Sequence, residues 1–254
     1  MHRRRLATTG VALVAALGLA LTGCGNQTGS DTPAANGSAA PSSSAPADAL
    51  GQLSAAAQKL NENSVRMKME SSVLSGSGVL DPARKTGDIT MKLGPQGTFR
   101  ILMAGDDAYL KVTGMAGLPD KWMHMDATKL GASGQFNLMP DGDPGGAKKM
   151  ISTVVEVRET APGSFAGTMD YTRTLKSDKE IAALGAKAKA VPFTARVDGE
   201  GRLTEFAVDT SVLQASLGTM TTTYSDFGTD VKVTAPPAAQ TQEAPPELIK
   251  AFGA

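Results

Sequence analysis

The chain has 254 residues with 25 basic and 25 acidic side chains, so its formal charge is zero. Three of the basic residues fall within the first 23 positions, and the rest of the chain is therefore net negative. This balance argues against nucleic-acid binding, which needs a basic patch to neutralise phosphates. It also argues against broad electrostatic adhesion to anionic lipid surfaces.

The first 23 residues have the pattern of an export signal. Three arginines at positions 3–5 precede an uncharged apolar run over 6–21, and small residues then lead to Cys24. A basic start, a short apolar core and a small-residue cleavage site are typical of a signal that is removed from the mature protein. The run is also shorter than the ~20 residues that a membrane-spanning helix needs. We interpret residues 1–23 as a signal peptide.

The four residues Leu21-Thr22-Gly23-Cys24 resemble the lipobox of bacterial lipoproteins. The resemblance implies that the Cys24 thiol carries a diacylglyceryl thioether and that Cys24 becomes the first residue of the mature, membrane-anchored protein. The protein would then lie on the extracytoplasmic face of the cell membrane. The alternative is a plain secretory signal with an incidental cysteine. Because Cys24 is the single cysteine, we expect no disulfide in the mature domain.

Residues 24–47 are rich in Gly, Ser, Ala, Pro and Thr and contain almost no bulky apolar side chain. Such a segment cannot bury enough surface to offset its chain entropy, so we expect a disordered tether with a reach of ~25 Å. Asp48 then predicts the start of a helix whose apolar face carries Leu50, Leu53, Ala57 and Leu60.

From residue 65 onward the apolar period changes from helical to two, which is typical of strands with one dry and one wet face. Short turns between the alternating segments predict an antiparallel meander, with one turn at 75–78 and a last strand at 231–233. The pattern predicts one α+β domain over 48–236, with roughly ten strands and two or three helices. We expect residues 237–254 to form a Pro/Ala-rich, frayed tail in which Leu248, Ile249 and Phe252 can dock as a helical turn.

The sequence offers little material for catalysis or metal binding. His124 is the single histidine after position 23, and it lies in a strand pattern where a half-exposed structural role is expected. One histidine without a free cysteine argues against zinc. Asp141 and Asp143 begin like a calcium loop, but the twelfth position is Ser152 instead of glutamate, which leaves only a weak calcium site open. We expect no enzyme activity and no cofactor.

The order of features is similar to that of actinobacterial lipoproteins of the LppX/LprG type. The shared features are the lipobox, the tether, an Ala/Leu helix and a series of short strand motifs: 65–69, 109–110, 121–122, 224–228 and 233–236. The resemblance implies a strongly curved antiparallel half-barrel with helices covering its concave face. It also implies an acyl-lined cavity and a role in carrying lipid or lipoglycan through the cell envelope, with a membrane transporter as a possible partner.

The residues themselves favour a lipid-binding interior. The chain has 12 methionines, whose flexible thioethers adapt to irregular apolar space, while aromatic residues make up only 4%. We expect a monomer, with an apolar cavity that accepts an acyl chain between the sheet and its helices. The alternative is a non-enzymatic surface interaction module whose core is filled. The predicted lining of the cavity is Met67, Met69, Ile89, Met91, Phe99, Ile101 and Met103.

Overall fold

The computed structural model of this protein describes residues 46–115, 118–129, 143–173 and 184–251. The predicted signal peptide and Cys24 lie outside these residues, as do Asp141 at the start of the predicted calcium loop and Phe252. The tether predicted over 24–47 lies outside them up to residue 45, and its last two residues, Pro46 and Ala47, belong instead to the first helix.

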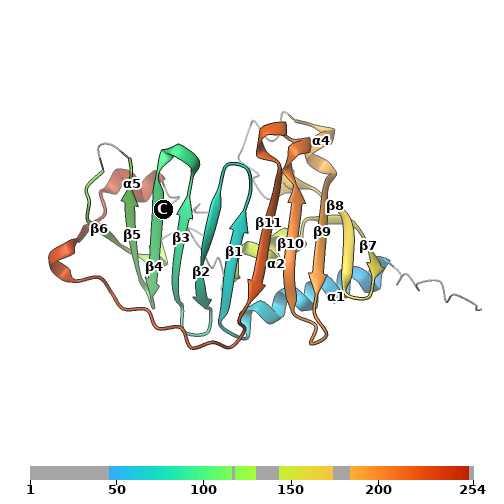
Figure 1. The fold of residues 1–254 in the computed structure, drawn as a ribbon, viewed down its shortest axis with the longest axis horizontal. Helices are drawn as coiled ribbons and strands as arrows, with labels where there is room; N and C mark the ends of the chain where they lie inside the picture. Colours follow the sequence, from blue (N-terminus) through green and yellow to red (C-terminus); the bar gives the residue numbers. More distant parts are fainter. Residues whose placement is uncertain (1–45, 116–117, 130–142, 174–183, 252–254) are drawn as a thin grey trace, which may run out of the picture. The chain divides into compact units, whose positions relative to one another are not determined.

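Twelve strands of the described residues form one open sheet in the order β12-β6-β5-β4-β3-β2-β1-β11-β10-β9-β8-β7 (Figure 1). The strands are β1 Val65–Glu70, β2 Ser75–Asp81, β3 Thr86–Lys92, β4 Thr98–Ala104, β5 Asp107–Thr113, β6 Trp122–Asp126, β7 Val154–Ala161, β8 Ser164–Met169, β9 Val191–Val197, β10 Leu203–Asp209, β11 Thr219–Ser225 and β12 Thr241–Glu243. The α-helices are α1 Pro46–Gln58, α2 Ala147–Ile151, α4 Ala186–Lys189 and α5 Pro246–Ala251. Single 3-10 turns make up the remaining helical elements: η1 Lys59–Asn61, η2 Gly94–Gln96, η3 Ala127–Lys129, η5 Pro144–Gly146, η6 Tyr171–Arg173, η7 Thr210–Val212, η8 Ala215–Leu217 and η9 Ala238–Gln240.

Two meanders build the sheet. Strands β1 to β6 pair in chain order, strands β7 to β11 do the same, and the antiparallel β1–β11 pair joins the two series. The other strand pairs are also antiparallel, except for β12, which runs parallel to β6. The predicted α+β class with a large antiparallel sheet is confirmed.

The sheet has one apolar and one polar face, as the alternation predicts. Residues directly opposite each other in an antiparallel pair share a face, and the register places Met67 opposite both Tyr224 and Gly78. Gly78 in turn faces Ile89. We call this apolar side the helix-side face, because α1 packs on the β7, β9 and β10 strands that continue it (Figure 1).

Ion pairs and polar side chains cover the opposite face. The Arg100 guanidinium makes two hydrogen bonds to the Asp88 carboxylate, at 3.0 and 2.7 Å, and its Cζ lies 5.6 Å from the centroid of the Trp122 ring. This bidentate hydrogen bonding raises the pKa of Arg100. Charged side chains thus lie on this face beside two buried apolar ones, Leu102 and Trp122.

Strands β2 and β3 approach very closely at Gly78. A Cβ atom there would lie 2.0 Å from the carbonyl oxygen of Asp88 and 2.7 Å from Cγ1 of Ile89. Only glycine permits this spacing, because any side chain would overlap the neighbouring backbone. Gly78 therefore permits the short distance between β2 and β3 on the helix-side face.

Helix α1 buries one face against the sheet. Its buried residues are Ala49, Leu53, Ala56 and Ala57, and Leu60 follows in η1. The sequence predicted Leu50 on this face, but Leu50 is exposed and Ala49 is buried in its place. The helix starts at Pro46, so Asp48 lies in its first turn, where a carboxylate interacts favourably with the helix dipole.

Three predicted elements differ in the structure. The turn predicted at 75–78 is wrong, because these residues begin β2; the chain turns earlier, where Ser71 and Leu74 exchange hydrogen bonds. The strand predicted at 231–233 is also absent. Residues 238–251, which the sequence suggests as a frayed tail, contain η9, β12 and α5. The docking predicted for Leu248 and Ile249 is confirmed, because both pack against the core within α5.

The close approach at Gly78 gives a stability prediction. Gly78→Ala should lower the free energy of unfolding by about 1–3 kcal/mol, because the added methyl overlaps backbone atoms of β3. Urea denaturation followed by circular dichroism measures the change. Gly51→Ala is the matched control: Gly51 lies inside α1 with no atom within 4 Å of the added methyl, so it should raise the stability by up to about 1 kcal/mol. Equal stability of the two variants would contradict the packing described here.

Candidate functional site

The seven residues predicted to line a cavity all lie on the helix-side face. Met67, Ile89 and Ile101 fall in one row across the sheet, because Met67 and Ile89 both pair with Gly78 and Ile89 pairs with Ile101. The row on one side of it contains Met69, Met91 and Phe99. The row on its other side contains Met103, because Met103 pairs with Gly87, Gly87 with Leu80, and Leu80 with Val65.

Four of the seven side chains are buried and three are partly exposed. Met69, Met91 and Met103 are the partly exposed ones, and each is a methionine on a different strand. Unbranched thioethers change rotamer easily and can follow the outline of an apolar ligand. Whether these residues bind a ligand stays a prediction.

The turn η5 crosses the helix-side face at the joint between the two meanders. A Cβ atom at Gly145 would lie 2.7 Å from Sδ of Met67 and 3.5 Å from the Tyr224 hydroxyl oxygen, so the backbone passes directly over both side chains. Gly145 has φ 64°, a left-handed conformation that glycine adopts without strain.

Asp143 anchors this crossing. Its two carboxylate oxygens each accept a 3.0 Å hydrogen bond, from the backbone N–H groups of Lys148 and Lys149, at the start of α2. Asp143 is buried. It is one of the two side chains that the sequence suggested as ligands of a weak calcium site. The other, Asp141, lies outside the described residues. Within the part of the chain that the structure describes, no group of three or more acidic, histidine or cysteine side chains could hold a metal ion.

Sequence reasoning missed two polar residues on the helix-side face, Tyr224 and Thr222 of β11. Tyr224 lies opposite Met67, and Thr222 lies opposite Met69. Burial, and secondarily the negative charge of Asp143, raises the pKa of Tyr224 far above its usual range. The sequence alone did not predict that Tyr224 and Thr222 lie opposite Met67 and Met69, because the pairing of β1 with β11 joins the two ends of the domain.

A groove of about 800 Å³ lies at the β7 edge of the sheet. Leu50 of α1 and Val155 of β7 contribute exposed side chains to it, and Phe193 contributes its ring from β9. Glu156 and Arg158 of β7 also line the groove. It is an open, mixed surface at the sheet edge, away from the seven predicted residues.

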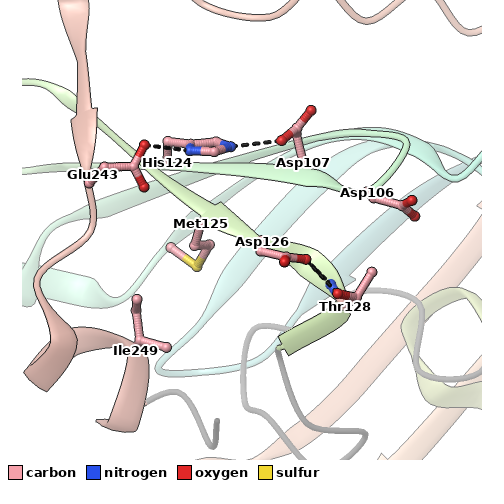
Figure 2. Close-up of a pocket in the computed structure, with 8 residues that line it drawn as sticks. All are labelled: Asp106, Asp107, His124, Met125, Asp126, Thr128, Glu243 and Ile249. Carbon is pink, nitrogen blue, oxygen red and sulfur yellow. Dashed lines mark hydrogen bonds and ion pairs between the residues drawn. The ribbon is translucent and has the colours of Figure 1, made fainter.

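A second pocket, of about 530 Å³, lies near the other edge and contains the predicted strand histidine (Figure 2). The His124 ring lies between two carboxylates: Nε2 is 2.7 Å from Oδ1 of Asp107, and Nδ1 is 2.8 Å from Oε1 of Glu243. Asp107 belongs to β5 and Glu243 to β12, so the imidazole connects three strands. Met125 and Ile249 supply the apolar side of the pocket.

The two carboxylates determine the charge of the imidazole. The hydrogen bond to Asp107, which has the larger effect, and the hydrogen bond to Glu243 both raise the pKa of His124 above its ordinary value of 6.5. The Tyr109 ring packs at 5.2 Å between ring centroids. Since both ring nitrogens face carboxylates, His124 has no nitrogen left to activate a nucleophile in this arrangement.

No helix among the described residues is long and apolar enough to cross a membrane.

Comparison with known proteins gives structural likenesses alone. No protein-family model matches the chain, and no curated protein matches it. Among solved structures, the crystal structure of the Mycobacterium tuberculosis lipoprotein LppX covers 74% of this chain and 99% of its own, with 15% sequence identity and a TM-score of 0.49.

The two hydrogen bonds that hold His124 between Asp107 and Glu243, which we call the histidine clamp, give a prediction for pH dependence. Because the folded pKa of His124 is raised, its contribution to stability is fully present below the unfolded pKa of about 6.5 and is lost as the pH rises through the folded value. Nuclear magnetic resonance titration of the imidazole should give a pKa above 6.5, and Glu243→Gln should lower it. As a control, Glu247→Gln in α5 removes a carboxylate that makes no such contact and should leave the titration unchanged. An imidazole pKa at or below 6.5 in the wild-type protein would contradict the clamp.

Proposed function

We propose that this protein is a membrane-anchored exported lipoprotein that binds an acyl chain on its helix-side face and carries it within the cell envelope. The observation that supports this most directly is that three methionines on three different strands, Met69, Met91 and Met103, are partly exposed on the apolar helix-side face. An apolar surface between a sheet and its helices is a common place for an apolar ligand.

The energetics favour an acyl chain over a compact ligand. Each CH₂ group transferred from water to such a surface contributes about 0.8 kcal/mol. A long chain can therefore bind well without polar contacts along its length. The methionines suit this task because one flexible lining can accept chains of different length and unsaturation.

The anchor at Cys24 complements this binding surface. Acyl chains on the Cys24 thiol would keep the domain at the membrane, where two or more chains hold far more durably than one. The low-complexity segment over 24–47 would let the domain leave the bilayer surface while still attached. Such an arrangement supports transfer of lipid between the membrane and a neighbouring envelope component, with a membrane transporter as a candidate partner and the carrier acting as a monomer.

A binding role also fits the chemistry of the described residues better than a catalytic one. His124 is held by two carboxylates on the polar side of the sheet edge, and the helix-side face presents thioethers and aliphatic groups. Thioethers and aliphatic groups bind apolar ligands but do not transfer protons or attack carbonyl groups.

The β7 edge groove favours a second candidate function, a non-enzymatic surface interaction module. Val155 is 53% exposed and Leu50 is 37% exposed, and both line this groove. A protein that binds no lipid but retains this surface would fit the second function.

Lipid analysis and a matched pair of variants test the proposed function. Protein with Cys24→Ala, expressed in its bacterial host, should co-purify with acyl lipid that native mass spectrometry detects. Met91→Gln should weaken binding of an apolar dye, 1-aminoanthracene, by about tenfold, because a partly exposed thioether of the lining becomes polar. Lys92→Gln lies one position along β3 on the polar face and should have no effect. Lipid-free protein that binds no dye would reject the carrier function.

The anchor has a separate test. Wild-type protein should fractionate with membranes, and Cys24→Ala should shift it to the soluble fraction, because the acyl chains cannot be attached without the thiol. Gly25→Ala, at the neighbouring position, should leave the protein in the membrane fraction. Equal distribution of wild type and Cys24→Ala would show that lipidation does not anchor this chain.

A further inference from the structure

The sheet of the described residues ends in an open strand at β7. This strand, Val154–Ala161, pairs with β8 on one side and has no strand partner on the other within the described sheet (Figure 1). An edge strand directs alternate backbone N–H and C=O groups away from its neighbour, where another strand can pair with them. The register of β7 against β8 is irregular at both ends and regular over 156–159. A short, regular stretch of edge is therefore available for pairing.

Two charged residues in this stretch have no ion-pair partner among the described residues. Val157 is buried on the helix-side face, so its neighbours Glu156 and Arg158 lie on the opposite, polar face, where both are exposed. The six other arginines that the structure describes all form ion pairs, whereas Arg158 forms none. A partner strand at this edge could supply the missing opposite charges.

The order of these charges is complementary to itself in one antiparallel register. When two copies of β7 pair about a twofold axis at Val157, Glu156 of each copy lies opposite Arg158 of the other. Moving the axis by one residue places Glu156 opposite Glu156, or Arg158 opposite Arg158. Opposite charges directly across a strand pair stabilise it, and like charges destabilise it. Charges on an edge often prevent pairing, but this order favours it in a single register.

The apolar side chains beside this edge and the path of the chain also favour a second copy. The exposed side chains of Leu50 and Val155 line the β7 edge groove together with Glu156 and Arg158. Ala47, in the first turn of α1, lines the same groove, so the predicted tether joins the domain beside this edge. Two copies paired here would have both predicted tethers joined to them near the shared interface. Anchoring in one membrane would then raise the local concentration of the copies.

We propose that two copies of this chain pair through antiparallel β7 strands about a twofold axis at Val157, with Glu156 of each copy opposite Arg158 of the other. A pair of short strands is a small interface, so dilute protein stays monomeric, and the pair forms where the anchor concentrates the protein. The proposal is independent of the acyl-binding function, because the seven residues proposed to line the acyl site lie on β1, β3 and β4.

Sedimentation velocity of the Cys24→Ala protein, at about 1 to 500 μM, tests the pairing. We expect a dimer with a dissociation constant on the order of 100 μM. Arg158→Glu should raise this constant by about tenfold or more, because both symmetric charge pairs become Glu opposite Glu. Lys92→Glu makes the same charge reversal at an exposed residue of β3 and should have no effect. A wild-type domain that stays monomeric over the whole range overturns the proposal and leaves the edge to an extended segment of another protein.

A mixture of two variants tests the register itself. Glu156→Arg should weaken the dimer as Arg158→Glu does, because it places Arg opposite Arg. An equimolar mixture of the two variants should again form dimers, since every cross-strand charge pair then joins opposite signs. A mixture that stays monomeric, or dimers that persist in each variant alone, overturns the proposal. Both variants should bind 1-aminoanthracene as the wild type does. Loss of dye binding in every protein, with the dimer intact, would reject the acyl-binding function and leave the pairing in place.

Discussion

The pairing of β1 with β11 is the contact on which the rest of the structure depends. Each meander consists of neighbours in the sequence, but this pair joins residues about 160 positions apart, as the Arg66–Asp226 ion pair at its end illustrates. The Ser64 hydroxyl donates to the Thr229 carbonyl oxygen, and the Gly228 N–H donates to the Ser64 carbonyl oxygen at 2.9 Å. Such long-range pairing is slow to form because the intervening chain must first be ordered. Once it is made, one continuous sheet presents one continuous apolar face.

The β1–β11 pair is also where several polar and polarizable side chains lie close together. Met67 and Tyr224 face each other across it, and η5 passes above them with Gly145 at the closest point. Asp143 fixes the turn by accepting hydrogen bonds from α2. A buried tyrosine, a carboxylate and a flexible thioether therefore meet at the centre of the sheet, although they come from the beginning, the middle and the end of the domain.

Alternation of apolar and polar residues was enough to predict most of the strands, their antiparallel order within the meanders and the common face of the seven proposed lining residues, but it also predicted a strand at 231–233 that is absent. It failed at 75–78, where glycine was read as a turn although it serves the close approach of β2 and β3. It also failed at β12, whose three residues Thr241–Glu243 are too few to show a period. Partners across the long-range pairings, such as Tyr224 for Met67 and Glu243 for His124, depend on tertiary register, which a single sequence does not contain.

The parallel strand β12 has a consequence for how the sheet ends. Edge strands expose unpaired N–H and C=O groups that can recruit other chains. β12 covers β6 over Trp122–His124, and the Ala244 N–H continues the ladder by donating to the His124 carbonyl oxygen at 2.8 Å. Clipping the chain before Thr241 would uncover this margin together with Met123 and Met125, and the shortened molecule would be prone to self-association.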